Sequence, residues 1–203
     1  MSMPSMWMVP RLDRFEASHP DLDLRVSATA RLVDFADDGI DLAVRYGEGR
    51  YPGLHVDLLM EEVVTPVCSP MLIQKEGSII RVEDLAQHTL LHDDGAIIPG
   101  SNLVWSNWLA AAGCPGLELK RGPHFSDAHL TVQAAMGGRG IMLGRSVLIA
   151  EELRNGSLVA PLDIRLPARL AYYLVCPHEM LNTAKVAAFR DWILKETRND
   201  QTL

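Results

Sequence analysis

The chain has 203 residues, of which 48% are hydrophobic and 22% are charged. This composition supplies enough apolar surface for a folded core, in one domain or two small ones, and excludes a disordered chain. The net charge is −7 and the Lys and Arg residues form no basic stripe. These residues are therefore poor candidates for binding nucleic acid themselves.

Three cysteines, Cys68, Cys114 and Cys176, lie far apart and form no CxxC pair, as is typical of buried thiols in a reducing compartment. No apolar run reaches the length that crosses a membrane. The opening MSMPSMWMVPRL lacks the cationic region of a signal peptide. The sequence therefore predicts a cytoplasmic protein with no membrane partner.

The first part of the chain alternates between predicted helices and strands. In chain order these are a helix at 6–18, a strand at 22–28, a helix at 31–39, a strand at 40–47, a loop at 48–53 and a strand at 60–70. Ser2 is a candidate N-cap of the first helix, Pro10 conflicts with its interior, and Gly39 is placed to end the second. This order predicts an α/β fold with a mostly parallel sheet.

The later part of the chain continues the mixture. Helices are expected at 81–88, 102–113, 146–156 and 182–197, and strands at 157–162 and 170–177. There is no internal repeat and no long linker. If the chain forms two lobes, it must cross between them on strands.

The stretch FSDAHLTVQAAMGGRGIML (125–143) needs separate treatment. Its glycines follow a predicted helix and precede a strand, whereas a phosphate-binding loop lies after a strand and before a helix. A helix C-cap at Gly137 or Gly138 explains them better. Ser126 and Asp127 precede the same helix, so capping is favoured over catalysis. The amide groups there could hold an anion.

No motif has the spacing of a catalytic or metal site. The seven histidines form no HExxH or HxH pair, the GxSxG motif is absent, and "LLHDDG" around His92 reads as solvated loop residues. The acidic pairs are sequence neighbours in polar settings, namely Asp37–Asp38, Glu61–Glu62, Asp93–Asp94 and Glu151–Glu152. The prediction is therefore no catalytic residue, no metal and no cofactor.

Polar residues at the ends of predicted segments favour binding of a small molecule over turnover. In open α/β sheets ligands gather at such ends. The residues in question are Ser2, Thr29, Arg45, Tyr46, Gly47, the start of the helix at 126–129, and Tyr172.

Taken in order, eight segments resemble the effector-binding (substrate-binding-like) domain of LysR-type transcriptional regulators, in the subgroup that contains the glycine-cleavage and β-lactamase activators. They are WMVPRLDRFEASHPDLDLRV, LVDFADDGIDLAVRYGEGRYPGL, PVCSP, DLAQHTLLH, WSNWLAAAG, FSDAHLTVQAAMGGRGIML, GSLVAPL and FRDWILKE. Each segment alone is weakly specific, but their order covers nearly the whole chain.

The resemblance implies two Rossmann-like lobes with a cleft between them, as in type 2 periplasmic binding proteins. Lobe I would comprise 1–65 and 167–203, without the family's first strand, and lobe II would comprise 66–166. A small-molecule effector would bind in the cleft, and small carboxylates are candidates because Arg45 and helix N-termini can hold them.

The resemblance also implies a set of effector-binding residues. These are Ser2, Thr29, Arg45, Tyr46, Gly47, Asp127, Ala128, His129 and Tyr172. For Ser2 and Asp127, helix capping without ligand contact is the alternative. For Thr29 and Tyr172, a position away from the ligand is equally open.

The resemblance implies a regulator that works as a homodimer or homotetramer. The first helix (6–18) and the lobe II helix (127–136) are the candidate contact elements. DNA would be bound only through a helix-turn-helix that precedes this region in the family and is absent from these residues. A periplasmic-type solute-binding protein and an uncharacterised small-molecule enzyme remain as alternatives.

Overall fold

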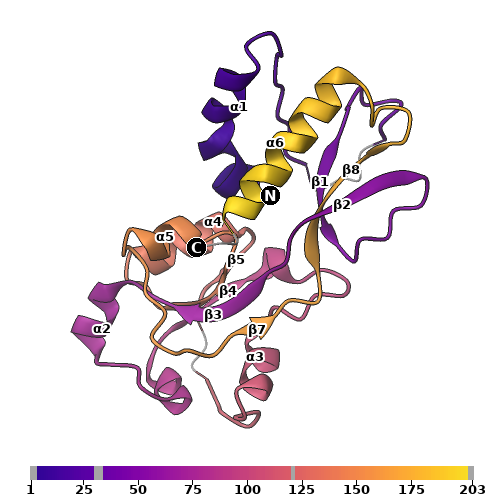
Figure 1. Cartoon of the computed structure of the whole chain (residues 1–203). Helices are drawn as coiled ribbons and strands as arrows, with labels where there is room; N and C mark the ends of the chain where they lie inside the picture. Colours follow the sequence, from indigo (N-terminus) through magenta and orange to yellow (C-terminus); the bar gives the residue numbers. More distant parts are fainter. Residues whose placement is uncertain (1–3, 30–33, 120–121, 201–203) are drawn as a thin grey trace. The chain divides into compact units, whose positions relative to one another are not determined.

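The computed structural model describes residues 4–29, 34–119 and 122–200. The chain divides into two compact units (Figure 1). The first holds the residues up to 61 and those from 170 onward, and the second is Glu62–Arg169. Each unit has its own sheet, so each is described by itself.

The first unit contains a three-stranded sheet in the order β1-β8-β2. Its strands are β1 (Ala43–Gly47), β2 (Leu54–Met60) and β8 (Ala171–Pro177), and both pairings are antiparallel. The expected parallel sheet is therefore wrong for this unit. β1 and β2 run in the same direction on either side of β8, and both ladders are antiparallel because β8 runs the opposite way between them.

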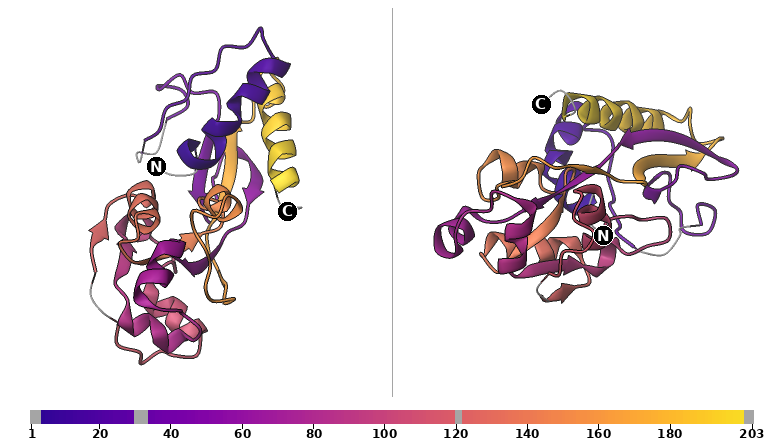
Figure 2. Two further views of the ribbon diagram at one scale, coloured as in Figure 1. Left: turned by 90° about the vertical axis from the view of Figure 1, so that its left-hand side faces the viewer. Right: turned by 90° about the horizontal axis from the view of Figure 1, so that it is seen from below.

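Two helical segments lie side by side in the first unit, as both views show (Figures 1 and 2). The predicted helix at 6–18 is present but irregular: η1 (Pro4–Met8) is a π-helix, η2 (Val9–Arg11) is a 3₁₀ turn, and α1 (Leu12–Ser18) is α-helical. Pro10 falls in the 3₁₀ turn, since proline does not fit an α-helix interior. The predicted C-terminal helix is α6 (Ala184–Asp200), and the Phe15 and Phe189 rings join α1 to α6 with centroids 5.2 Å apart.

Two predicted strands do not form. Residues 22–28 are irregular and mostly exposed, with Val26 41% exposed, because no described strand pairs with them. Residues 157–162 supply only a single bridge, between Val159 and Cys68. Alternating hydrophobic residues predicted a strand at 22–28, but a strand also needs a neighbouring strand to pair with, and the described residues supply none there.

The turn before β1 lies partly outside the described residues. Of the predicted helix at 31–39, the part from residue 34 onward is a turn, closed by a hydrogen bond from the Asp38 amide to the Asp34 carbonyl. Gly39 has φ +63°, the left-handed conformation that its predicted terminating role requires.

The second unit contains a five-stranded sheet in the order β5-β4-β6-β3-β7. The strands are β3 (Val63–Val67), β4 (Leu90–Asp93), β5 (His124–Phe125), β6 (Ile141–Arg145) and β7 (Leu166–Pro167). β4 runs parallel to β5 and β6, whereas β3 is antiparallel to β6 and β7. The carboxyl ends of β4, β5 and β6 therefore meet at one edge of this sheet.

Short helices surround this sheet. They are α2 (Pro70–Glu76), η3 (Val82–Gln87), η4 (Asp94–Ala96), α3 (Trp105–Ala111), α4 (Ala128–Met136) and α5 (Ala150–Arg154). The helices predicted at 81–88, 102–113 and 146–156 are thus confirmed in shorter form. α4 packs against β4, β5 and β6, and the fully buried Trp108 and Leu90 belong to the core of this unit.

Candidate functional site

The edge where the three parallel strands end carries polar side chains. β4 ends at Asp93, β6 ends at Arg145, and β5 is followed by Ser126 and Asp127 at the start of α4. Ligands of open α/β sheets bind at such carboxyl ends, near helix N-termini that favour anions. This edge is the candidate functional site of the second unit.

The stretch 125–143 forms one side of this edge. The Asp127 side chain caps α4, because its Oδ1 accepts a 2.9 Å hydrogen bond from the His129 amide. Ala128 is buried and the His129 side chain is exposed. At the other end Gly137 has φ −73° and Gly138 has φ +68°, so Gly138 is the left-handed residue after the helix. The glycines therefore terminate a helix, as expected, and do not form a phosphate loop.

A buried ion pair lies at the end of β6. The Arg145 guanidinium donates to Glu62 Oε2 through Nε and lies 2.9 Å from it through Nη2. The side chains are only 7% and 0% exposed. Because this pair is deeply buried, it fixes the end of β6 to Glu62, the residue that precedes β3. Removing one partner would leave the other charge buried and uncompensated.

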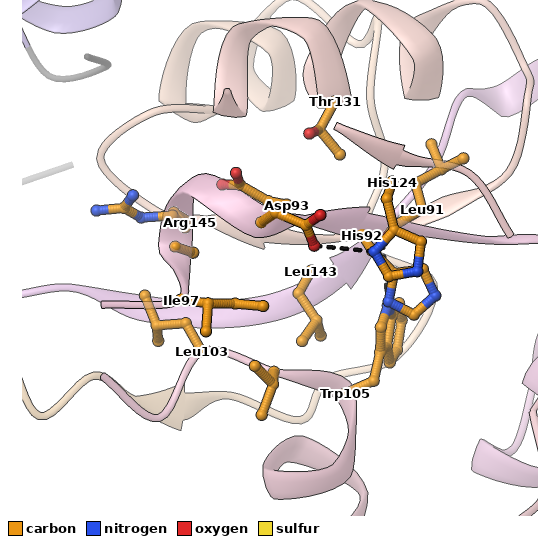
Figure 3. A pocket seen from close by; sticks show the side chains of 13 residues that line it. Leu91, His92, Asp93, Ile97, Leu103, Trp105, His124, Thr131, Leu143 and Arg145 are labelled. Atoms are coloured by element: carbon orange, nitrogen blue, oxygen red, sulfur yellow. Dashed lines mark hydrogen bonds and ion pairs between the residues drawn. The ribbon is translucent and has the colours of Figure 1, made fainter. Parts of the chain in front are cut away.

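Asp93 is the buried carboxylate of this edge. Both of its oxygens are inaccessible to solvent and accept no hydrogen bond of normal geometry. Burial raises its pKa, an effect that Arg145 and the nearby amides of Gly95 and Ala96 oppose and that the charge of Asp127 reinforces. The charge of Asp93 therefore depends on those two amides and on Arg145 for the stabilisation it receives. Figure 3 shows Asp93 between Arg145 and the pair His92–His124.

Two histidines face each other across β4 and β5. The rings of His92 and His124 stack with centroids 4.3 Å apart and an interplanar angle of 7°, and His124 Nδ1 lies 2.8 Å from Asp94 Oδ1 (Figure 3). Burial lowers the pKa of His92, and the neighbouring His124 lowers it further. The predicted solvated reading of LLHDDG holds for the exposed Asp94 but is wrong for Asp93.

A small cavity lies among these residues. It encloses about 60 Å³, enough for about two water molecules. It is lined by Leu91, His92, Asp93, Asp94, Ala96, Ile97, Leu103, Val104, Trp105, His124, Thr131, Leu143 and Arg145. Seven of these thirteen residues are apolar, and the polar ones are His92, Asp93, Asp94, His124, Thr131 and Arg145.

In the first unit the structure brings two predicted site residues together. Tyr46 on β1 and Tyr172 on β8 are directly opposite each other, and their ring centroids are 4.7 Å apart. Tyr172 is 3% exposed. Cross-strand aromatic pairs of this kind stabilise a sheet, whatever ligand role they have.

Arg45 and Gly47 lie on the opposite face of β1 from Tyr46, since side chains alternate along a strand. The Arg45 guanidinium carbon lies 5.1 Å from the centre of the Tyr51 ring and 5.6 Å from that of Phe35. A Cβ on Gly47 would come within 2.6 Å of the Tyr51 hydroxyl oxygen. The structure thus places Arg45 and Gly47 in a packed aromatic group, away from Tyr46.

The remaining predicted residues are less informative. Ser2 lies outside the described residues, and Thr29 is an exposed residue of an irregular segment. Among the residues that the structure describes, no cluster of three or more His, Cys, Asp or Glu side chains could hold a metal ion. No helix in the described ranges has the length and apolarity to cross a membrane.

The cysteines fit the buried-thiol interpretation in part. Cys68 and Cys176 are buried, Cys114 is half-buried, and none forms a disulfide. Burial raises the pKa of the Cys68 thiol to about 11, which keeps it protonated and unreactive.

Comparison with known proteins decides the family. The family model "LysR substrate binding domain" matches residues 1–198. The chain belongs to the LysR substrate binding domain family. It is 38% identical over 195 residues to the glycine cleavage system transcriptional activator of Escherichia coli K12, covering 96% of this chain and 62% of that protein. It is 33% identical over 189 residues to the transcriptional activator AmpR of Citrobacter koseri, covering 93% and 62%.

Solved structures agree with this assignment. The effector domain of AmpR from Pseudomonas aeruginosa has a TM-score of 0.78 and 29% identity, and the match covers 98% of this chain and 94% of that one. LysR substrate binding domains share the type 2 periplasmic-binding-protein-like fold, so the predicted fold class is confirmed. The chain spans 62% of the length of the two curated relatives.

Sequence reasoning missed Asp93, Arg145 and Thr131. A usable signal was present for the first: Asp93 ends an apolar run, and strand alternation puts it on the same side as the buried Leu91. Arg145 also ends an apolar strand. Its pairing with Glu62, 83 positions away, is visible only in the folded chain.

Proposed function

We propose that this chain is the effector-sensing part of a LysR-type transcriptional regulator. In this proposal the unit up to 61 and from 170 is lobe I, and Glu62–Arg169 is lobe II. The full-length protein would control transcription through DNA-binding residues outside this sequence, in the cytoplasm where the DNA lies. A homodimer or homotetramer would carry the signal, with the first helix and α4 as contact elements.

The observation that carries the proposal is the edge of the second unit. Three parallel strands end there beside the N-terminus of α4, with Asp93, Asp127 and Arg145 at their ends. This arrangement supplies polar groups for recognition but no nucleophile with an adjacent base, which favours binding over turnover. The relatives are named transcriptional activators, which also favours a regulator over an enzyme or a transport binding protein.

The effector would be a small molecule that carries a carboxylate. The amides at the start of α4, held in place by Asp127, suit an anionic group. In lobe I, Tyr46 and Tyr172 are the paired aromatic candidates. Ser2, Thr29, Arg45, Gly47, Ala128 and His129 complete the proposed set. Binding would change transcription only if its affinity differs between arrangements of the regulator.

The test is a calorimetric screen of small carboxylates against the wild type, Asp127→Ala and Tyr172→Phe. Asp127→Ala removes the carboxylate that caps α4 at the His129 amide, so we expect weaker binding if this cap holds the first turn of α4 in the ligand-binding conformation. Tyr172→Phe keeps the ring and removes the hydroxyl. Asp163→Asn is the matched control, because Asp163 is 98% exposed on the surface of the same unit.

A carboxylate that binds the wild type and the control alike, and both site variants more weakly, supports the proposal. Equal binding to all four proteins refutes the site assignment. Conversion of a bound ligand into a product would revive the enzyme alternative. Repression or activation of a reporter by the full-length protein, responsive to the same carboxylate, tests the regulatory role.

A further inference from the structure

Two imidazole rings form part of the wall of the cavity in the second unit (Figure 3). The rings of His92 and His124 stack with their centroids 4.3 Å apart, and His124 Nδ1 lies 2.8 Å from the Asp94 carboxylate. Among the described residues, neither ring nitrogen of His92 has a hydrogen-bond partner. One ring of the pair therefore has an anion beside it, and the other ring does not.

We propose that His92 takes up a proton when the carboxylate of the effector enters this cavity, so that an imidazolium ion holds the ligand and binding tightens as pH falls. This deepens the function proposed above and rests on its assignment of this edge as the effector site. The proton comes from the solvent and goes to a ring nitrogen of His92. No covalent bond to the ligand forms.

The stacked arrangement keeps His92 neutral while the cavity holds no anion. Burial lowers the pKa of His92, and the neighbouring His124 lowers it further, whereas the Asp94 charge acts in the opposite direction. Two imidazolium ions with their rings 4.3 Å apart would repel each other. Because the ordinary pKa of histidine is already near 6.5, the lowered value leaves His92 uncharged at pH 7.

The other charged groups of this edge already have partners. Arg145 is paired with the buried Glu62, and the Asp127 carboxylate accepts a hydrogen bond from an α4 amide. The Asp93 oxygens are inaccessible to solvent, and Arg145 and two backbone amides stabilise their charge. The counterion for a protonated His92 must therefore come from a ligand. By linkage, the factor by which that anion favours the proton is also the factor by which the proton favours the anion.

The size and the walls of the cavity fit a carboxylate group. The volume of about 60 Å³ holds about two water molecules, which the two oxygens of a carboxylate can replace. Leu103 and Leu143 exclude water from one part of the wall, which strengthens an ion pair inside the cavity. Thr131 of α4 lies on the same wall, so this position agrees with a ligand bound beside the start of that helix.

The test follows the titration of each imidazole by NMR, with acetate as the probe. Proton–carbon spectra of the imidazole Cε1–Hε1 groups would be recorded from about pH 5 to 8, in sodium acetate and in sodium chloride of equal ionic strength. His92→Gln identifies the His92 signal among the seven histidines. We expect the His92 midpoint to rise in acetate by about half a pH unit or more, which corresponds to acetate at about twice its Kd for the protonated form.

Two controls accompany this measurement. His178 is an exposed histidine of the first unit, so it should titrate at the same pH in both salts. Acetamide has nearly the shape of acetate but no charge, and it should leave the His92 midpoint unchanged. A His92 midpoint that is equal in acetate and chloride overturns the proposal. An equal rise at His178, or an equal rise caused by acetamide, overturns it as well.

Calorimetry separates this inference from the proposed function. For each carboxylate that binds in the screen described above, titrations at pH 7 in buffers of different ionisation enthalpy give the number of protons taken up. Wild type and His178→Gln should take up a measurable fraction of a proton, and His92→Gln close to none, with a Kd that no longer depends on pH. Thermal unfolding checks that His92→Gln is folded.

The outcomes of this titration differ for the two proposals. Carboxylate binding with equal proton uptake in wild type and His92→Gln, or with none in either, overturns the role of His92 and leaves the proposed function standing. Binding of no carboxylate at all overturns both. Proton uptake that disappears in His92→Gln and persists in His178→Gln supports the inference.

Discussion

The ion pair between Arg145 and Glu62 offers the sharpest test of how the second unit is held together. Arg145→Met keeps most of the length and apolar volume of the side chain but removes the guanidinium. In the native structure this group donates through Nε to Glu62 Oε2 and lies 2.9 Å from the same oxygen through Nη2. Glu62 has a side chain with 0% exposure, so the variant leaves its carboxylate with no solvent to replace the lost partner.

The expected cost follows from that burial. Removing one member of a buried pair typically destabilises by about 3–5 kcal/mol, since the remaining charge is uncompensated. An exposed pair would cost at most about 1 kcal/mol. The double variant Arg145→Met/Glu62→Gln removes both charges, so it should recover more than half of the loss. The non-additivity of the two changes measures the pair itself.

The assay is urea unfolding followed by fluorescence. The chain has four tryptophans, two in each unit: Trp7 and Trp192 in the first, Trp105 and Trp108 in the second. Replacing Trp7 and Trp192 with phenylalanine leaves a signal from the second unit alone, in which the loss should appear. A destabilisation below about 1 kcal/mol, or a double variant as unstable as the single one, would refute the reasoning that Glu62 is sealed from water.

Three further predictions concern conformation and pH. Gly138→Ala should lower the free energy of unfolding in urea by about 1–2 kcal/mol, because φ +68° is strained for alanine. Gly137→Ala, at φ −73°, should lower it by less than about 0.5 kcal/mol. Equal effects would contradict the assignment of Gly138 as the residue that ends the helix. The raised pKa of Asp93 means that the native state binds the carboxyl proton more tightly than the unfolded chain does. The wild type should therefore lose stability relative to Asp93→Asn as pH rises above about 4. A stability difference that does not depend on pH would contradict this. Burial of Asp57 opposes its ionisation, but the bidentate contact with Arg190, helped by His55, outweighs burial and lowers the pKa of Asp57. The stabilisation from this contact is present above about pH 4 and is lost as pH falls through the native pKa, so Asp57→Asn should flatten the acid side of the profile of stability against pH. An unchanged acid side would count against the pair.

Local signals in the sequence were sufficient for several elements. The helix in 125–143, its cap at Asp127 and its glycine end follow from short-range rules, and the structure has all three. The C-terminal helix was predicted from its apolar stripe of Val186, Phe189 and Ile193, all of which are buried. These features depend on residues within one or two turns of each other, which is why the sequence alone reveals them.

Strand pairing was harder to predict. Residues 22–28 alternate as cleanly as β1 does, yet only β1 has a partner, and β2 was overlooked although Leu54, Val56 and Leu58 alternate with polar neighbours. Strand direction was also wrong in the first unit, where β8 pairs antiparallel with both neighbours. A strand is stable only through its partner, and β8 comes more than 100 positions after β2.

The candidate site divides in the same way. The sequence by itself determined the family resemblance, the α/β class and the capped start of α4, because each rests on local pattern or on the order of segments along the chain. Only the tertiary structure decided that Tyr46 meets Tyr172, and that the carboxylate oxygens of Asp93 are buried while Asp94 is exposed. Burial and charge pairing depend on what the folded chain brings against each side chain, and for Arg145 that partner is Glu62, 83 residues away.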